Sequence, residues 1–393
     1  MMNIRMALRV PMAGLLALSL GGCAGFGESL STGFGLWGGK EGAEKPLPLA
    51  EIKPSASINT QWRVGVGSAG DYVFSPAVDG DSVYAAGVDG NVARFDAESG
   101  KQLWRVETGK KLSAGVGVGS GLVLMATRKG EVLAYDPDGK ALWQSRVSSE
   151  VLSAPQVAEG IVVVRAADGQ IYGLDARNGK SKWVYQRALP SLAIRSHAGV
   201  VVMRGGVFAG YAGGKLVALS LSNGVLGWEA SVAQPRGATE LERIADVTSQ
   251  PVADGSSICA VAFQGRVACF EIINGNLIWA REMSSISGLS VDASSLYVSD
   301  ARGAVHALDK SSGASLWKQD KLLNRRLSAP VVIGKHVAVA DLEGYVHFLS
   351  REDGSFAARA ATDGSAIAAT PLLLGQNLLL QTRNGGLFAL AAQ

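Results

Sequence analysis

The stretch Asp89-Gly90-Asn91-Val92-Ala93-Arg94-Phe95-Asp96-Ala97-Glu98-Ser99-Gly100-Lys101-Gln102-Leu103-Trp104 decides the fold, because copies of it recur along the chain. Each copy has a leading Gly, an apolar strand, an Asp-like residue, a short polar turn containing Gly, and then Trp. The other copies that end in Trp are Gly130 to Trp143, Gly169 to Trp183, Gly214 to Trp228, Gly265 to Trp279 and Gly303 to Trp317. Self-similarity at a nearly constant period is typical of solenoids, propellers and other repeat architectures.

The last two copies are incomplete. The seventh starts at Gly344 and has Ala358 where Trp is expected, and the eighth starts at Gly385 and stops before its turn and Trp. Ile58-Asn59-Thr60-Gln61-Trp62 is an unattached strand ending in Trp that precedes the first full copy. Transferring this strand to the last copy completes eight units. A ring closes in this way, because pairing the two ends of the chain removes a free sheet edge.

Each copy is predicted to form four strands. The 336 residues from 58 to 393, divided among eight copies, give 42 residues each, which fits four strands of about 5–6 residues plus turns. Second strands such as 82–86 and 161–165 are almost wholly apolar, as expected for strands covered on both faces. The sequence therefore predicts an all-β fold, an eight-bladed β-propeller of four-stranded antiparallel blades over residues 55–393, closed by an N-terminal strand completing the C-terminal blade.

The regularly spaced Trp residues have two interpretations. A large ring at the same place in each blade would bury roughly 150–250 Å² between neighbouring blades. Alternatively, the rings could form a set that stacks on a ligand. Six copies at equivalent positions favour the packing role.

The N-terminus predicts an exported lipoprotein. Arg5 and Arg9 precede an apolar stretch of 11 residues, 10–20, which is too short to span a bilayer but suits a secretory signal. The stretch leads into Leu20-Gly21-Gly22-Cys23, which looks like the lipobox of bacterial lipoproteins. We expect residues 1–22 to be a signal peptide and Cys23 to carry the lipid. Residues 23–54, rich in Gly, Ser and Pro, are predicted to form a flexible tether.

Charge argues against a nucleic-acid partner. The formal net charge of the 393 residues is +3, and two of these charges lie in the segment expected to be removed. The mature chain is thus near neutral, and it has no run of Lys or Arg that would indicate a nucleic-acid surface.

The repeats resemble the PQQ-like repeat of quinoproteins, over residues 58 to 393. Two other stretches, Ser191-Leu192-Ala193-Ile194-Arg195 and Thr239-Glu240-Leu241-Glu242-Arg243-Ile244-Ala245-Asp246-Val247, add a second resemblance. With the lipobox and the single minimal propeller, they resemble the BamB family, the lipoproteins of the outer-membrane β-barrel assembly (BAM) complex.

This second resemblance implies a non-enzymatic scaffold that binds the POTRA domains of BamA and aids assembly and insertion of β-barrel proteins. The family's contact residues match here at Leu192, Ile194, Arg195 and Asp246. At Thr248 the family pattern often has a second acid, so an acidic contact is expected to be weaker or absent. The resemblance also implies other BAM members as partners, and unfolded outer-membrane proteins that could pair with an exposed blade edge. Ala24, in place of Asp after the lipidated cysteine, implies anchoring at the periplasmic face of the outer membrane of a Gram-negative bacterium.

Repeat spacing identifies the same region independently. The surplus residues of the longer repeats follow Trp183 and Trp228, where a fourth strand returns to the first strand of the next blade. Such connections emerge on one face of a ring, so we expect segments 187–196 and 234–250 to be neighbours on one rim. Long loops on a rigid scaffold often carry binding residues. Arg195 and Asp246 could instead pair with each other across this rim. The segment 322–326 is a second, less specific patch on the same face, which could equally be an ordinary solvated loop.

The alternative function is that of a PQQ-dependent quinoprotein dehydrogenase, because those enzymes share the repeat. The resemblance to them would require calcium-ligating acids, a catalytic Asp and an adjacent-cysteine disulfide, and no Cys-Cys pair occurs in this sequence. We therefore expect no catalytic residues, no cofactor and no metal. His306 and His347 occupy the same repeat position, and we interpret them as packing residues rather than metal ligands.

Cys259 and Cys269 flank a hairpin centred near Gln264-Gly265. Export to the periplasm permits a disulfide between them, but spacing alone cannot fix the strand register that would bring them together. A pair of buried thiols is the favoured alternative, and the disulfide remains open.

Overall fold

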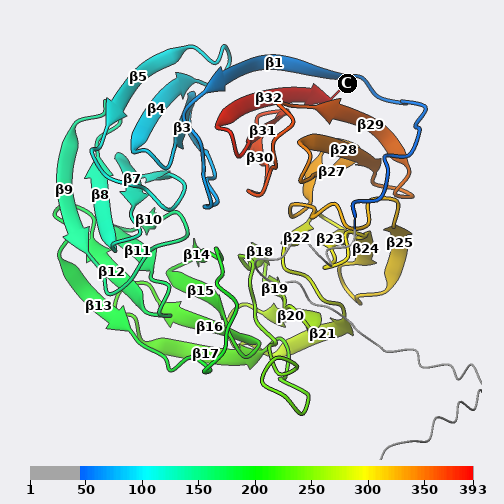
Figure 1. Cartoon of the computed structure of the whole chain (residues 1–393). Helices are drawn as coiled ribbons and strands as arrows, with labels where there is room; N and C mark the ends of the chain where they lie inside the picture. The colour runs from blue at the N-terminus through cyan, green and yellow to red at the C-terminus, as the bar shows by residue number, and fades with distance from the viewer. Residues whose placement is uncertain (1–44, 393) are drawn as a thin grey trace, which may run out of the picture. The chain divides into compact units, whose positions relative to one another are not determined.

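The computed structural model describes residues 45–392, and within them every regular element is a β-strand. The strands form eight four-stranded antiparallel sheets that follow one another around a ring (Figure 1). Seven sheets have strands in chain order, and the eighth has the order β1-β32-β31-β30. The predicted eight-bladed propeller is confirmed. The predicted signal peptide, Cys23 and the first part of the tether lie outside the described residues.

The strands of the first four blades have the following bounds. They are β2 (Ala77–Asp79), β3 (Ser82–Ala86), β4 (Asn91–Asp96) and β5 (Gln102–Glu107) in blade 1; β6 (Gly117–Gly119), β7 (Leu122–Ala126), β8 (Glu131–Tyr135) and β9 (Ala141–Arg146) in blade 2; β10 (Gln156–Ala158), β11 (Ile161–Arg165), β12 (Ile171–Asp175) and β13 (Ser181–Tyr185) in blade 3; and β14 (Val200–Met203), β15 (Gly206–Tyr211), β16 (Lys215–Ser220) and β17 (Leu226–Ser231) in blade 4.

The remaining blades continue the pattern. Their strands are β18 (Val252–Asp254), β19 (Ser257–Val261), β20 (Arg266–Glu271) and β21 (Leu277–Glu282) in blade 5; β22 (Gly288–Val291), β23 (Ser295–Ser299), β24 (Val305–Asp309) and β25 (Ser315–Gln319) in blade 6; β26 (Val331–Ile333), β27 (His336–Ala340), β28 (Tyr345–Ser350) and β29 (Phe356–Ala361) in blade 7; and β30 (Leu372–Leu374), β31 (Asn377–Gln381), β32 (Gly386–Ala392) and β1 (Ile58–Gly65) in blade 8.

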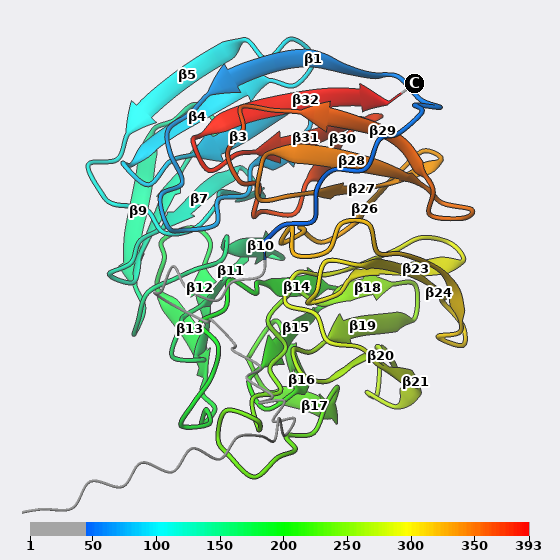
Figure 2. The same cartoon turned by 45° about the vertical axis from the view of Figure 1, so that its right-hand side comes forward.

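The ring closes through its two ends, as predicted. β1 pairs antiparallel with β32, from Ile58 opposite Ala392 to Gly65 opposite Gly386. The two strands lie side by side in both views of the molecule (Figures 1 and 2). This pairing gives the last blade its outer strand, so that blade 8 has four strands like the others.

Burial follows the position of a strand within its blade. All five residues of β3 and of β7 are buried, because these second strands are covered on both faces by neighbouring blades. The fourth strands are outermost and leave apolar side chains such as Leu103 and Leu142 about half exposed. The core is therefore a series of layers between adjacent blades.

The Trp residues pack between blades at seven of the eight junctions of the described ring. In each case the indole Nε1 donates a hydrogen bond of 2.8–3.1 Å to a carbonyl of the following blade. A turn glycine of that blade lies against the ring; a Cβ added at Gly100, for example, would come within 2.6 Å of Trp62. Gly100 also has a φ of +70°, which favours glycine. The packing interpretation is confirmed, and it explains why Gly and Trp recur together.

The eighth junction explains why the seventh repeat lacks Trp. Ala358 stands at the Trp position of β29, and the next blade is the one completed by β1, so no turn connects its third and fourth strands. The entering chain occupies this place, since the backbone N–H groups of Ser55 and Ala56 donate to the carbonyl of Ala357. An indole at Ala358 would have no turn glycine to pack against.

Residues 45–54, which we expected to belong to the flexible tether, make specific contacts with the propeller. The N–H of Leu47 donates to the Leu323 carbonyl at 3.0 Å, and its carbonyl accepts from Arg325 Nη1 at 2.9 Å. The carbonyl of Ala50 accepts from Arg359. A backbone without a strand partner still offers carbonyl acceptors, and composition alone did not reveal the two arginines that bind them.

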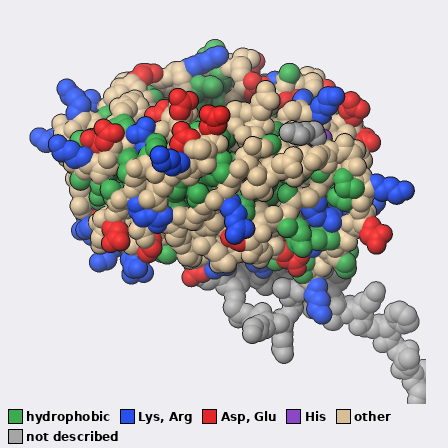
Figure 3. Space-filling view, turned by 90° about the horizontal axis from the view of Figure 1, so that it is seen from above, with side chains coloured by type: hydrophobic (Ala, Val, Ile, Leu, Met, Phe, Trp, Pro, Cys, Tyr) green, Lys and Arg blue, Asp and Glu red, His purple; other side chains and the backbone are tan. Residues whose placement is uncertain are grey.

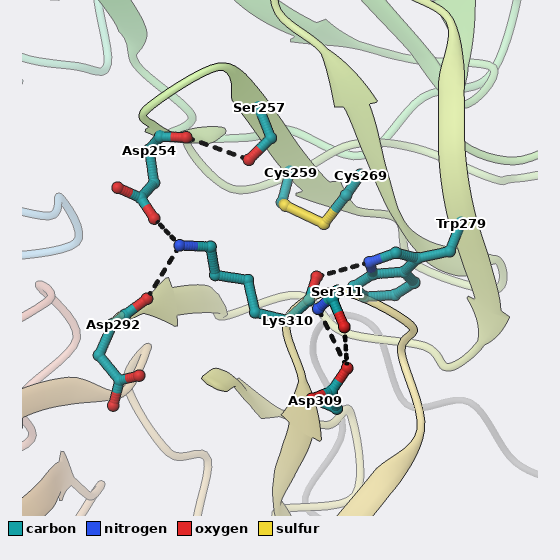
Figure 4. Close-up of a disulfide and its surroundings, with 9 residues drawn as sticks. All are labelled: Asp254, Ser257, Cys259, Cys269, Trp279, Asp292, Asp309, Lys310 and Ser311. Atoms are coloured by element: carbon teal, nitrogen blue, oxygen red, sulfur yellow. Dashed lines mark hydrogen bonds and ion pairs between the residues drawn. A yellow bond between two sulfur atoms is a disulfide. The ribbon is translucent and has the colours of Figure 1, made fainter. Parts of the chain in front are cut away.

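Cys259 and Cys269 form a disulfide (Figure 4). They lie directly opposite each other in β19 and β20, and both are almost fully buried. The favoured alternative of two free thiols is therefore wrong. The register of the hairpin, which the spacing could not fix, decides the pairing.

The described surface has no dominant sign of charge in the view of Figure 3, where acidic and basic side chains are interspersed. Among residues 45–392 there is no helix of a length and hydropathy suited to crossing a membrane.

Candidate docking face

The two long connections between blades are neighbours, as the spacing of the repeats predicted. The backbone N–H of Ile194 donates to Asp246 Oδ2 at 2.7 Å, and Ser196 Oγ donates to the Thr248 carbonyl at 2.8 Å. These bonds join the connection 186–199, between blades 3 and 4, to the connection 232–251, between blades 4 and 5. We call the surface formed by these two connections the docking face.

Asp246 organises this face from within. Its side chain is 3% exposed, and both carboxylate oxygens accept backbone N–H groups, Oδ2 from Ile194 and Oδ1 from Gly213 at 3.0 Å. A carboxylate with these partners fixes one loop on another and presents little surface to a second protein. Thr248 is buried as well, at 8% exposed, and donates to the Ile286 carbonyl.

Arg195 is partnered by an acid, but not by Asp246, so the alternative of an Arg195–Asp246 pair is wrong. Its Nε and Nη2 donate to the two oxygens of Glu150 at 3.0 and 2.9 Å. The guanidinium also lies 5.5 Å from the ring centroid of Tyr72. The hydrogen bonds to Glu150 raise the pKa of Arg195. With its side chain 34% exposed, Arg195 is held in one orientation while remaining accessible.

Sequence reasoning missed both partners of Arg195. Glu150 lies in the connection between blades 2 and 3, and Tyr72 lies in the connection between blades 8 and 1. These connections are equivalent to the one that carries Arg195, so the repeat alignment could have placed all three on the same face. It could not have shown that they touch.

The same two connections also carry apolar side chains that are exposed to solvent. Leu192 is 41% exposed and Ile194 is partly exposed. Leu241, which the sequence analysis did not select, is 65% exposed. It sits in a turn closed by Glu242, whose carboxylate accepts the N–H groups of Ala238 and Thr239. The N–H of Glu242 in turn donates to the Thr239 hydroxyl, which is the reciprocal pattern of a capping box.

A pocket of about 270 Å³ opens beneath the connection 186–199. Its walls include Leu152, Leu189, Ala198 and Val247, and its charged groups are Glu150, Arg165, Arg195 and Asp246. Three of the four residues predicted from the sequence, Ile194, Arg195 and Asp246, thus surround one cavity, and Leu192 stands beside it.

The patch 322–326 has a different role from the one its position suggested. Leu322 and Arg325 are at most 1% exposed, and Arg325 bonds to Asp341, Glu343 and the Leu47 carbonyl. This connection therefore binds the chain's own N-terminal segment.

The two equivalent histidines behave alike, as their repeat positions predicted. His306 Nε2 lies 2.9 Å from Asp300 and His347 Nε2 lies 2.9 Å from Asp341, each bond spanning six residues within one blade. Across residues 45–392 no cluster of three or more His, Cys, Asp or Glu side chains is arranged to hold a metal ion.

The fold defines an eight-bladed propeller of PQQ-like repeats, and the candidate site is a rim surface on which two long connections are held together. A family model described as outer membrane protein assembly factor BamB matches residues 88–319. The chain is 43% identical to the outer membrane protein assembly factor BamB of Bordetella pertussis, over 98% of this chain and 96% of that one. It is 45% identical to the protein of the same name from Nitrosomonas eutropha, over 98% and 95%. The chain belongs to the BamB family.

Solved structures agree with this assignment. The crystal structure of BamB from Moraxella catarrhalis matches with a TM-score of 0.79 at 26% identity, over 85% of this chain and all of that one. A quinohemoprotein alcohol dehydrogenase from Comamonas testosteroni matches with a TM-score of 0.69 at 13% identity, over 85% and 76%. At that identity the likeness to the dehydrogenase shows the shared fold alone.

Proposed function

We propose that this chain is an assembly factor of the BAM complex of a Gram-negative outer membrane, and that its docking face binds the POTRA region of BamA. The observation that carries the proposal is the combination of Leu192 and Arg195, both exposed on one loop that Asp246 and Glu150 hold in place. An apolar anchor beside a fixed guanidinium is typical of residues that dominate protein interfaces.

The direct contacts are assigned to Leu192, Ile194 and Arg195, and Asp246 is assigned a positioning role. This division follows from burial, since the carboxylate of Asp246 is already used by two backbone N–H groups. Leu241 is added as an apolar contact because of its exposure.

Replacing Leu192 and Arg195 together by Ala tests the assignment. We expect the double variant to lose co-purification of BamA from solubilised membranes while its melting temperature stays within about 2 °C of wild type, because both side chains are exposed. A matched control is Leu316→Ala with Lys318→Ala, two exposed residues on the outer strand β25. Undiminished co-purification by the first pair would remove the proposed interface.

We also propose that Cys23 is lipidated and holds the chain at the periplasmic face of the outer membrane. Support comes from the lipobox and from the name of the family, whose members are called outer membrane assembly factors. Cys23→Ser is expected to move the protein from the membrane fraction to the soluble periplasmic fraction. Retention of the variant in the membrane fraction in a strain lacking BamA would contradict lipid anchoring.

Unfolded barrel proteins are proposed to contact the outer blade strands. Apolar side chains such as Leu103, Leu142 and Leu316 are about half exposed on β5, β9 and β25, each the terminal strand of its sheet. Photo-crosslinkers at positions 102 and 315 should capture precursors during assembly. Crosslinks from precursors to the inter-blade loops alone would argue against strand pairing.

We propose that the chain acts without catalysis and without a quinone cofactor. The family name describes assembly rather than oxidation. Adding pyrroloquinoline quinone and Ca²⁺ should give neither a bound chromophore nor a rise in melting temperature; either result would favour the quinoprotein alternative.

A further inference from the structure

Within residues 45–392, one cation of the docking-face pocket has no acidic partner. Arg165 is the last residue of β11 and lines the pocket. Its Nη1 donates to the Ala198 carbonyl at 3.2 Å, and its guanidinium carbon lies 5.0 Å from the ring centroid of Tyr211. Among the residues that the structure describes, Arg165 forms no ion pair with any carboxylate.

The other charges of the pocket are compensated. Arg195 and Glu150 pair with each other, and Asp246 is satisfied by two backbone N–H groups. Arg165 is only partly exposed, and burial lowers its pKa. A partly dehydrated cation without a counter-charge is unfavourable, and a ligand that supplied one negative charge would relieve this.

The walls of the pocket restrict the ligand. Leu152, Leu189 and Val247 are apolar, so one part of the wall suits a short aliphatic stem. Glu150 and Asp246 also line the pocket, and they would repel a doubly charged group such as phosphate more strongly than a single carboxylate. A single carboxylate on a short stem meets both conditions, and the guanidinium fork can bind it through two parallel hydrogen bonds.

We propose that this pocket receives an Asp or Glu side chain of the protein that docks on this face, and that the carboxylate pairs with Arg165. The inference rests on the proposed function, because the pocket opens directly beside Arg195 and Ile194. It adds an acidic anchor of the partner, inserted between blades 3 and 4, to the apolar contacts described above.

Arg187 supplies a matched control. Its guanidinium carbon lies 5.7 Å from the ring centroid of the same Tyr211, but it is paired with Glu229 and does not line the pocket. If Arg165 served only to pack on Tyr211, removing either charge would have similar consequences for binding; the double-mutant cycle described below controls for its bond to the Ala198 carbonyl.

Binding of the full lipidated chain in detergent to the soluble periplasmic region of BamA tests the proposal. Arg165→Gln should raise the Kd by about 10- to 100-fold, because one partner of a desolvated charge pair is lost. Arg187→Gln should change it by less than about 3-fold, and Arg165→Lys should recover part of the loss. Equal effects of the two Gln substitutions would overturn the proposal.

A double-mutant cycle distinguishes two explanations of weaker binding by Arg165→Gln: loss of a charge pair with the partner, and a shift of the connection 186–199. Each Asp and Glu of the BamA region is replaced by Asn or Gln and measured against wild type and against Arg165→Gln. Replacement of one particular acid should weaken binding to the wild-type chain by a factor close to that of Arg165→Gln. The same replacement should have almost no effect on binding to the Arg165→Gln chain. If no acid shows this coupling, the proposal fails while the proposed interface can still stand.

If the BamA region does not bind wild type at all, the proposed function fails, and the pocket is judged by small probes. N-acetyl-aspartate N-methylamide should shift the Arg165 Nε–H resonance in a saturable way. A peptide blocked at its side-chain acids but free at its C-terminus, and inorganic phosphate, should shift it less. Absence of a shift with the aspartate probe, or a stronger response to either of the others, would refute an acidic side chain as the occupant.

Discussion

Arg195 and Arg325 occupy equivalent connections of the ring, three blades apart, and their surroundings differ. The Arg195 side chain is 34% exposed and is paired with the half-buried Glu150. The Arg325 side chain is 2% exposed and is paired with the fully buried Asp341, with Glu343 on its other side. Arg325 binds the carbonyl of Leu47, so the chain's own N-terminal segment covers it. One repeated position is thus buried in an internal ion-pair cluster in one place and stays accessible to solvent in another.

The largest expected effect is at the buried ion-pair cluster of Arg325, Asp341 and Glu343 that holds Leu47, which we call the clamp. Arg325→Ala leaves the buried carboxylate of Asp341 without its cation, and removal of one partner of a buried pair typically costs about 3–5 kcal/mol. Urea unfolding of the full chain should show this loss. If the free energy of unfolding falls by less than about 1 kcal/mol, Arg325 and Arg195 contribute similarly to stability. The proposed difference between the two sites would then be wrong.

A smaller loss is expected at Asp246. Asp246→Ala leaves the N–H groups of Ile194 and Gly213 unsatisfied, which costs about 1–3 kcal/mol for buried groups. Binding of BamA should weaken as well, because the loop carrying Leu192 and Arg195 loses its support. Asp246→Asn keeps one acceptor and should recover part of both losses. Full BamA binding by Asp246→Ala would show that this carboxylate does not position the docking face.

The clamp should also respond to pH through His347. This buried imidazole donates through Nε2 to Asp341 Oδ2, accepts from Arg359 Nε through Nδ1 at 3.2 Å, and has Tyr345 beside it. Desolvation lowers the pKa of His347 and outweighs Asp341, which raises it, while Arg359 and Arg325 add to the lowering. The folded chain therefore keeps the ring neutral where the unfolded chain already binds a proton.

Stability contributed by neutral His347 is therefore complete above the unfolded pKa of about 6.5 and is lost as pH falls below it. We expect the wild type to lose about 1 kcal/mol more than His347→Gln between pH 7.5 and 5.5, measured by urea unfolding. The lowered pKa of Asp341 acts in the same direction, but at a more acidic pH. Parallel curves for the two proteins would exclude His347 as the source.

The smallest expected effect on stability is at the solvent-accessible Arg195. Arg195→Ala should change the free energy of unfolding by less than about 1 kcal/mol, because pairs accessible to solvent contribute little. The same substitution should nevertheless weaken BamA binding. A stability loss as large as that of Arg325→Ala would show that Arg195 is another structural clamp.

Much of the fold could be predicted from the repeat alone. The spacing of Gly and Trp fixed the number of blades, and the orphan strand at Trp62 predicted the closure. The surplus length after Trp183 and Trp228 correctly placed two connections side by side. These inferences succeed because every blade must bury the same faces, so a local pattern repeated at one period leaves few alternative architectures.

The tertiary structure decided which side chains are available. The sequence alone gave no reason to expect different exposure for Asp246 and Arg195. In the structure, Asp246 is enclosed by backbone N–H donors, whereas Arg195 is held at the surface by Glu150 from a different connection. The disulfide of Cys259 and Cys269 depended on a strand register, and the clamp on residues 45–54 depended on groups about 280 to 310 positions away. Periodicity specifies backbone geometry, whereas burial, pairing and charge compensation arise from contacts between blades, which the linear order of residues does not contain.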